Sequence, residues 1–238
     1  MLLAAKYIRT FDLFGKSARI DLTQGYQKGR WAGLLDGASA STTRSGWTDT
    51  IARFAMNIYG APPLRGKDFA SYRVSREAET IVGVGLAVHL PTGEYMSERL
   101  INLGSNRFTF RPQIGLVHNR GNWSMELTGS AWIFTDNDDF FGGNTVEQDP
   151  LLTLAGHLIY TFRPGFWAGV SGGYGYGAES TVNGVNKDDH KENVAWALSA
   201  GYPLSREWGV KIAYLGTRKL ETNGLDGDTI SFAVSYLW

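Results

Sequence analysis

The sequence predicts an all-β fold, a transmembrane antiparallel up-and-down β-barrel in which residues 1–238 form a single domain. The last eleven residues, DTISFAVSYLW, place apolar side chains on one face of a strand and mostly small ones on the other. Such alternation suits a wall between lipid and a wet lumen, and the closing Trp238 suits the membrane interface. Two further observations agree: short and long connections alternate, and charged side chains keep to one parity of the strands.

Composition narrows the class of protein. With 43% hydrophobic residues and a mean hydropathy of -0.20, the chain has no run of about 18 apolar residues that could span a bilayer as a helix. A net charge of +0 gives no electrostatic case for a nucleic-acid partner. The absence of cysteine excludes disulfides, thiolate metal sites and a cysteine nucleophile.

About eleven segments have the length and side-chain alternation of tilted barrel strands. In chain order they are 3–14, 18–28, 47–59, 80–90, 107–118, 123–135, 151–162, 166–178, 193–204, 208–219 and 228–238.

The connections between these segments differ in length. Tight turns are predicted at 15–16, 119–121, 163–165 and 205–207, and long polar loops at 36–44, 91–105, 136–149, 179–192 and 221–227. Short periplasmic turns and long outer loops are typical of outer-membrane barrels. The connection 60–79 departs from the pattern, since it is long where a short turn is expected.

The beginning of the chain has no recognisable export signal. Residues 1–5 are apolar, but Lys6 interrupts them before they reach the length of a signal-peptide core. Counting back from a periplasmic Trp238 places Met1 at the outer rim. Because bacterial single-chain barrels have even strand numbers, we expect about twelve strands in the intact protein, with one upstream strand and a signal peptide missing here.

Charge separates the two faces of the predicted strands. The outward parity is almost free of charge, whereas lysine or arginine at mid-depth on a lipid face costs about 2–4 kcal/mol. A soluble β-sandwich or lectin-like fold, the alternative, has no reason for this segregation. The predicted lumen-lining residues are Arg19, Asp21, Asp49, Arg53, Arg107, Arg111, Gln113, Glu126, His157 and Lys211.

The inward charges have two interpretations. They could form a constriction that selects solutes by its electric field, or an ion-pair network that fills and stiffens the barrel, as side chains do in small barrels. The inward parity of Gly83, Gly85, Gly169, Gly173, Gly175 and Gly177 thins the inner wall and indicates a passage or space for bulky side chains from across the barrel.

The loop 136–149 contains enough carboxylates for calcium, but its spacing is not that of an EF-hand, so a solvated acidic loop is favoured and no metal site is predicted. Phe140 and Phe141 in this loop are candidate mouth residues, either receiving apolar solutes or anchoring the loop at the lipid interface. An inward His157 with Ser124 or Ser130 makes a hydrolase conceivable, although no hydrolase motif surrounds them.

Several stretches resemble one known family. INLGSNRFTFRPQIG (101–115), WIFTDNDDFFGG (132–143) and EQDPL (147–151) are similar to outer-membrane transporters associated with the meta-cleavage pathway of phenol degradation. The resemblance covers nearly the whole chain and implies a barrel whose cargo is aromatic or hydrophobic. It carries no established binding or catalytic residues.

Together these features predict a transporter or channel for small, aromatic or hydrophobic, molecules in the bacterial outer membrane. A non-conducting structural or adhesion barrel and, further behind, an outer-membrane hydrolase are the alternatives. No enzyme activity and no cofactor are predicted. The expected partners are outer-membrane lipid, a small-molecule solute and the barrel-assembly machinery, which would recognise the strand ending in Trp238.

Overall fold

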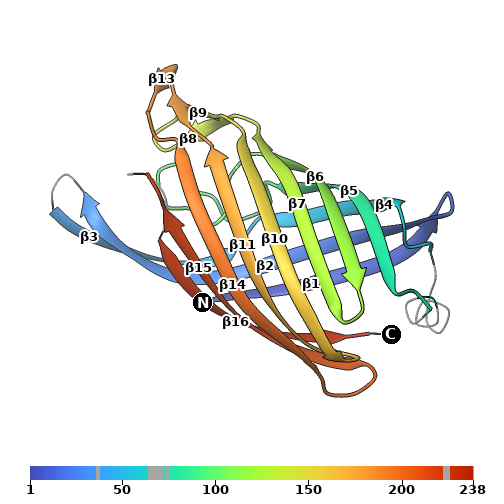
Figure 1. Cartoon of the computed structure of the whole chain (residues 1–238). Helices are drawn as coiled ribbons and strands as arrows, with labels where there is room; N and C mark the ends of the chain where they lie inside the picture. Colours follow the sequence, from blue (N-terminus) through green and yellow to red (C-terminus); the bar gives the residue numbers. More distant parts are fainter. Residues whose placement is uncertain (36–37, 64–71, 73–74, 222–225, 238) are drawn as a thin grey trace.

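The computed structural model describes residues 1–238 except 36–37, 64–71, 73–74, 222–225 and 238. For residues 33–35 and 38 it describes the backbone alone. One long antiparallel sheet curls around a central space (Figure 1). Its path consists of β1 (Leu2–Leu13), β2 (Lys16–Leu35), β4 (Thr50–Tyr59), β5 (Ala78–Leu90), β6 (Thr109–Arg120), β7 (Trp123–Phe134), β10 (Leu151–Arg163), β11 (Phe166–Gly177), β14 (Lys191–Pro203), β15 (Trp208–Lys219) and β16 (Gly227–Tyr236).

This path confirms the predicted all-β, up-and-down architecture, because each strand pairs with the next strand of the path in antiparallel register. All eleven predicted segments correspond to strands of the path. Among the described residues, β1 and β16 are the two edges of the sheet, and no pairing joins them. The sheet is therefore an open, curled half-barrel.

The two faces of the sheet differ as the alternation predicts. The convex face carries large apolar side chains that nothing in the protein covers; Ile114, Leu127 and Leu198, for example, are 55%, 51% and 57% exposed. The concave face carries the polar side chains, and its Asp21 is only 2% exposed. Because successive side chains point to opposite faces, the sequence alternation alone generates an apolar exterior and a polar interior.

Local backbone chemistry produces the tight turns at one end of the sheet, here named the turn end. Phe14 and Gly15 have φ of 54° and 72°, and the Gly15 amide donates to the Asp12 carboxylate at 2.8 Å. The left-handed conformation is accessible to glycine at little cost. Gly121 and Gly165, also with positive φ, make the corresponding turns after β6 and β10.

The opposite end, here named the loop end, contains structure that the sequence pattern did not reveal. The predicted loop 36–44 lies largely in β3 (Ala38–Trp47), which pairs with the second half of β2, so the predicted segment 47–59 divides between β3 and β4. This hairpin projects beyond the curled wall (Figure 1). Its two faces lack the polar and apolar alternation that identifies a strand in a wall.

The predicted loops 136–149 and 179–192 form a second sheet, here named the cap sheet. It contains β8 (Asn137–Phe140), β9 (Asn144–Gln148), β12 (Ser180–Val182) and β13 (Val185–Asn186) in the order β13-β12-β9-β8. These strands are too short to show a periodicity. Half of the connection 60–79, namely 64–71 and 73–74, lies outside the described residues, as does residue 238.

In the described part of the chain, no helix is long and apolar enough to cross a membrane.

Candidate functional site: a cationic and aromatic inner wall

Asp21 is the centre of an ion-pair cluster on the concave face. Its side chain is 3% exposed and lies 3.0 Å from Arg19, 3.2 Å from Arg53 and 3.5 Å from Lys6. The three cations come from β1, β2 and β4, so the cluster ties these strands together. Their side chains are 26–46% exposed, which leaves them accessible from the central space.

A single row of paired residues extends this positive charge across the wall. Asp21 is the register partner of Arg53, Arg53 of Ala87, and Ala87 of Arg111. Ala87 is only 5% exposed although it faces the central space. Its small side chain leaves room for Arg53 on one side and Arg111 on the other. The row therefore places two guanidinium groups on neighbouring parts of the inner wall.

Arg111 is held against an aromatic ring. Its guanidinium carbon lies 4.5 Å from the centre of the Trp132 ring, and its Nε donates to the Ser130 hydroxyl at 3.1 Å. The ring of His89 packs against the same indole, with 5.2 Å between ring centres. A cation over an aromatic face is stabilised by the quadrupole of the ring, so Arg111 and Trp132 fix each other's position.

Arg107 repeats this arrangement at the loop end, just before β6. It lies 4.6 Å from the centre of the Phe134 ring and donates to the side-chain oxygen of Gln148, which belongs to the cap sheet. Burial lowers the pKa of the Arg107 guanidinium below its usual value, and the charge of Asp136 opposes this shift. Arg107 thus connects the inner wall to the cap sheet.

A third cation and aromatic pair lies at the turn end. Trp167, Gly201 and Lys211 are register partners on β11, β14 and β15. The Trp167 indole covers Gly201, where an added Cβ would lie 2.3 Å from the indole nitrogen, and Lys211 lies 5.6 Å from the ring centre. Both side chains line a cavity of about 940 Å³. Glycine is required here because the ring occupies the place of a side chain.

His157 has a serine partner, but a different one from those expected. Its Nδ1 lies 2.7 Å from the hydroxyl of Ser171 on β11. Ser124 instead bonds to Asn119, and Ser130 bonds to Thr153 at 2.6 Å and to Arg111. The choice between neighbouring strands depends on their register, which the sequence does not reveal.

The remaining predicted residues occupy separate places. Glu126 is the register partner of His157, and Gln113 that of Ser130. Asp49 lies between β3 and β4, where it accepts hydrogen bonds from the amides of Gly93 and Ser105, both at 2.9 Å, and so fastens a loop rather than joining the ion-pair cluster.

Phe140 and Phe141 lie at the end of β8, in the cap sheet. Phe140 is half-buried, whereas Phe141 is 42% exposed. Within the described residues, no group of three histidine or acidic side chains is arranged to hold a metal ion.

Glycine gives the inner wall open space on β11. An added Cβ at Gly173 or Gly175 would meet its nearest atoms at 3.6 Å, an ordinary contact. The register partners of Gly173 are Ala155 and Ala195. This row of small residues therefore borders space into which a larger side chain could extend.

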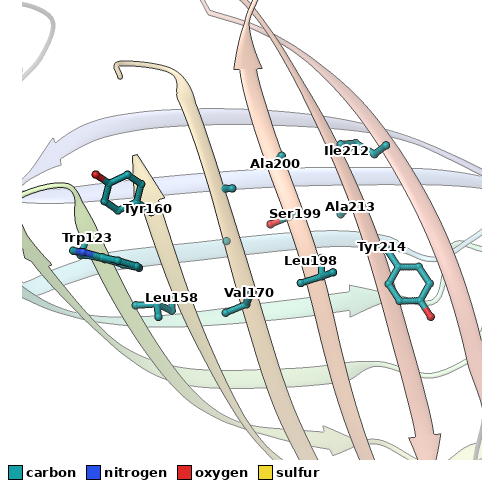
Figure 2. A pocket seen from close by; sticks show the side chains of 12 residues that line it. Trp123, Leu158, Tyr160, Val170, Leu198, Ser199, Ala200, Ile212, Ala213 and Tyr214 are labelled. Carbon is teal, nitrogen blue, oxygen red and sulfur yellow. The ribbon is translucent and has the colours of Figure 1, made fainter. Parts of the chain in front are cut away.

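The convex face has a shallow apolar groove of about 600 Å³ (Figure 2). Leu158, Val170, Leu198 and Tyr214, which are register partners on four neighbouring strands, form one side of it. The groove is hollow at Ala168 and Ala200 because their side chains are small. The groove belongs to the apolar exterior. None of the described cations of the inner wall lines it.

Comparison with known families identifies the chain. Residues 4–234 match the model of the family described as "Putative MetA-pathway of phenol degradation". The chain belongs to this family. The match extends over the curled sheet and the cap sheet, and it agrees with the resemblance carried by the sequence motifs.

Among solved structures, the chain is similar to a COG4313 outer membrane channel from Pseudomonas putida F1. The TM-score is 0.79 at 21% sequence identity, and the match covers 99% of this chain and 83% of that one. At this identity the likeness establishes the fold. None of the curated proteins matches the chain.

Proposed function

We propose that the protein is an outer-membrane channel for small aromatic or hydrophobic molecules and not an enzyme. The observation that carries this proposal is the inner wall, on which cations and aromatic rings are paired from the loop end to the turn end. The similar structure is an outer membrane channel, and the family name refers to phenol degradation. Both support the proposal.

The membrane orientation follows from the two ends of the sheet. The apolar convex face meets lipid, the turn end lies in the periplasm, and the loop end with its cap sheet faces the outside of the bacterium. The exposed aromatic residues near the turn end, Trp123, Tyr202 and Trp208 among them, suit the membrane interface. Outer-membrane lipid is then the principal partner of the convex face.

The pathway passes Arg107 and Phe134 below the cap sheet, then Arg111 and Trp132. It leaves through the cavity lined by Trp167 and Lys211. Phe140 and Phe141 border the outer mouth and receive apolar solutes there.

The barrel-assembly machinery is a further proposed partner. It would bind β16, an edge strand whose outward side chains Ile230, Phe232 and Val234 are 68%, 76% and 67% exposed. An edge strand offers unpaired backbone groups to another strand.

A non-conducting barrel is the second candidate, because the Asp21 cluster joins three strands and could serve only as a strut. A hydrolase has less support. The His157 and Ser171 pair supplies a base and a nucleophile, but a catalytic serine also requires a group that orients the histidine and donors for an oxyanion.

The proposal is tested by uptake of N-phenyl-1-naphthylamine, an aromatic probe that fluoresces when it enters a membrane interior. A Gram-negative host lacking its general porins is compared with and without the protein. We expect the initial rate of fluorescence increase to rise at least threefold with the protein. Equal rates, with the protein shown to be folded in the outer membrane, would contradict the channel function.

A further inference from the structure

The charge and the rings of the inner wall together indicate a more specific solute. We propose that the channel selects aromatic anions, such as aromatic carboxylates, over neutral aromatic compounds and over small anions without a ring. This inference rests on the proposed channel function and specifies its substrate class.

Positive charge exceeds negative charge on the wall formed by β1 to β6. Lys6, Arg19, Arg53 and Arg111 have the inward parity there, whereas the carboxylates of that parity are Asp12, Asp21 and Glu79. Asp49 is already bound by the backbone amides of two loop residues. Glu126 is on β7 and makes no ion pair with any described cation. An anion entering this region would restore the local balance of charge.

The cations of the Asp21 cluster remain accessible from the central space. The side chains of Lys6, Arg19 and Arg53 are 46%, 38% and 26% exposed. A carboxylate is the acceptor that a guanidinium binds most strongly, often through two parallel hydrogen bonds. A carboxylate in the central space can therefore bind the exposed parts of these cations.

The rings beside these cations add the aromatic requirement. The cation lies within 4.5–5.6 Å of the ring centre in the pairs Arg111 with Trp132, Arg107 with Phe134 and Lys211 with Trp167. In benzoate the carboxylate is bonded directly to the ring, so its two recognition elements are also adjacent. One cation and aromatic pair can thus contact both at once, the carboxylate through the cation and the ring through the aromatic side chain.

Two small residues allow the long side chains of their rows to lie over them. Ala87 separates Arg53 from Arg111, and Gly201 separates Trp167 from Lys211 in their rows. A larger residue would displace the arginines beside Ala87, which is 5% exposed, or the Trp167 indole that covers Gly201. The same design at both ends of the lumen gives an aromatic anion a succession of binding positions.

Ion selectivity tests the anionic half of the inference. The full-length protein is inserted into planar bilayers of neutral phospholipid, and the reversal potential is measured in a tenfold KCl gradient. We expect chloride to permeate at least threefold more readily than potassium. Arg111→Gln should reduce this ratio at least twofold, whereas the matched variant Glu126→Gln should leave it equal or raise it. A channel that prefers potassium would overturn the inference.

Block of the current tests the aromatic half. Benzoate, acetate and benzyl alcohol are added separately to the outer side, and the chloride current is measured. We expect half-block by benzoate at a concentration at least tenfold below those of acetate and benzyl alcohol. Trp132→Leu should reduce this advantage over acetate at least threefold, because the ring beside Arg111 is lost.

These outcomes separate the inference from the proposed function. Conductance with equal block by the three compounds would overturn the preference for aromatic anions and leave the channel standing. The absence of both conductance and probe uptake would overturn the channel itself, and the inference with it.

Discussion

Asp21 shows how one buried side chain organises the inner wall. Breaking a buried ion pair by removing one partner leaves the other charge without compensation. Here the loss would affect Lys6, Arg19 and Arg53 together, and all three lie within 3.5 Å of the carboxylate. Because these cations are partly exposed, water would recover part of the loss.

We therefore expect Asp21→Asn to lower the free energy of unfolding by about 1–3 kcal/mol. The measurement is urea unfolding in detergent micelles, followed by tryptophan fluorescence. Glu126→Gln is the control, since Glu126 makes no ion pair with a described residue, and it should change stability by less than about 0.5 kcal/mol. Equal effects of the two substitutions would show that the cluster does not stabilise the fold.

At the level of residues, the sequence predicts which face a side chain occupies but not what it contacts. Arg53, Arg111 and Lys211 lie on the concave face of the sheet because side chains alternate strictly between the two faces of a strand. Their pairing with Asp21, Trp132 and Trp167 depends on which strand lies beside which and in what register. The sequence also could not distinguish Asp49, which fastens a loop, from the residues of the wall.

The strands of the wall and those of the loop end differ in how readily the sequence predicts them. Segments such as 151–162 lie in lipid on one side and face the lumen on the other, so their alternation is strong. The cap sheet and the hairpin of β2 and β3 lie beyond the wall, where no lipid imposes alternation. Their physical setting explains why the sequence pattern there predicts loops.

The junction between β11 and the cap sheet depends on a glycine. Gly177 has a φ of 118°, and an added Cβ there would lie 2.3 Å from the carbonyl oxygen of Pro150. At Gly175, two residues earlier on the same face, the nearest atom would be at 3.6 Å.

Gly177→Ala is thus expected to destabilise the protein by about 1–3 kcal/mol, because alanine is strained in this conformation. Gly175→Ala should change the free energy of unfolding by less than about 1 kcal/mol. Urea unfolding in micelles compares the two. If both variants were as stable as the wild type, the backbone at Gly177 would differ from that described.

At the scale of the whole molecule, the edges β1 and β16 carry backbone groups that the described sheet does not pair with each other. Lipid offers no hydrogen bonds, so an open sheet edge is strongly unfavourable in a membrane. Eleven strands form the path of the described sheet. We propose that further strand pairing covers both edges in the membrane.

Amide hydrogen exchange in lipid nanodiscs tests this closure. We expect the amides of β1 that do not bond to β2, and those of β16 that do not bond to β15, to exchange as slowly as amides in the internal strands β6 and β7. Exchange of these edge amides at the rate of the loops would show that the sheet remains open.

The central claim is that the curled sheet encloses a path for solutes, and single-channel conductance tests it most directly. Gly173 faces the lumen with room for a side chain, whereas Gly172 faces lipid with no atom within 4 Å of an added Cβ. We predict discrete current steps for the wild type, at least a twofold reduction for Gly173→Leu, and no change for Gly172→Leu. No current steps, or an equal effect of the two leucines, would contradict the claim.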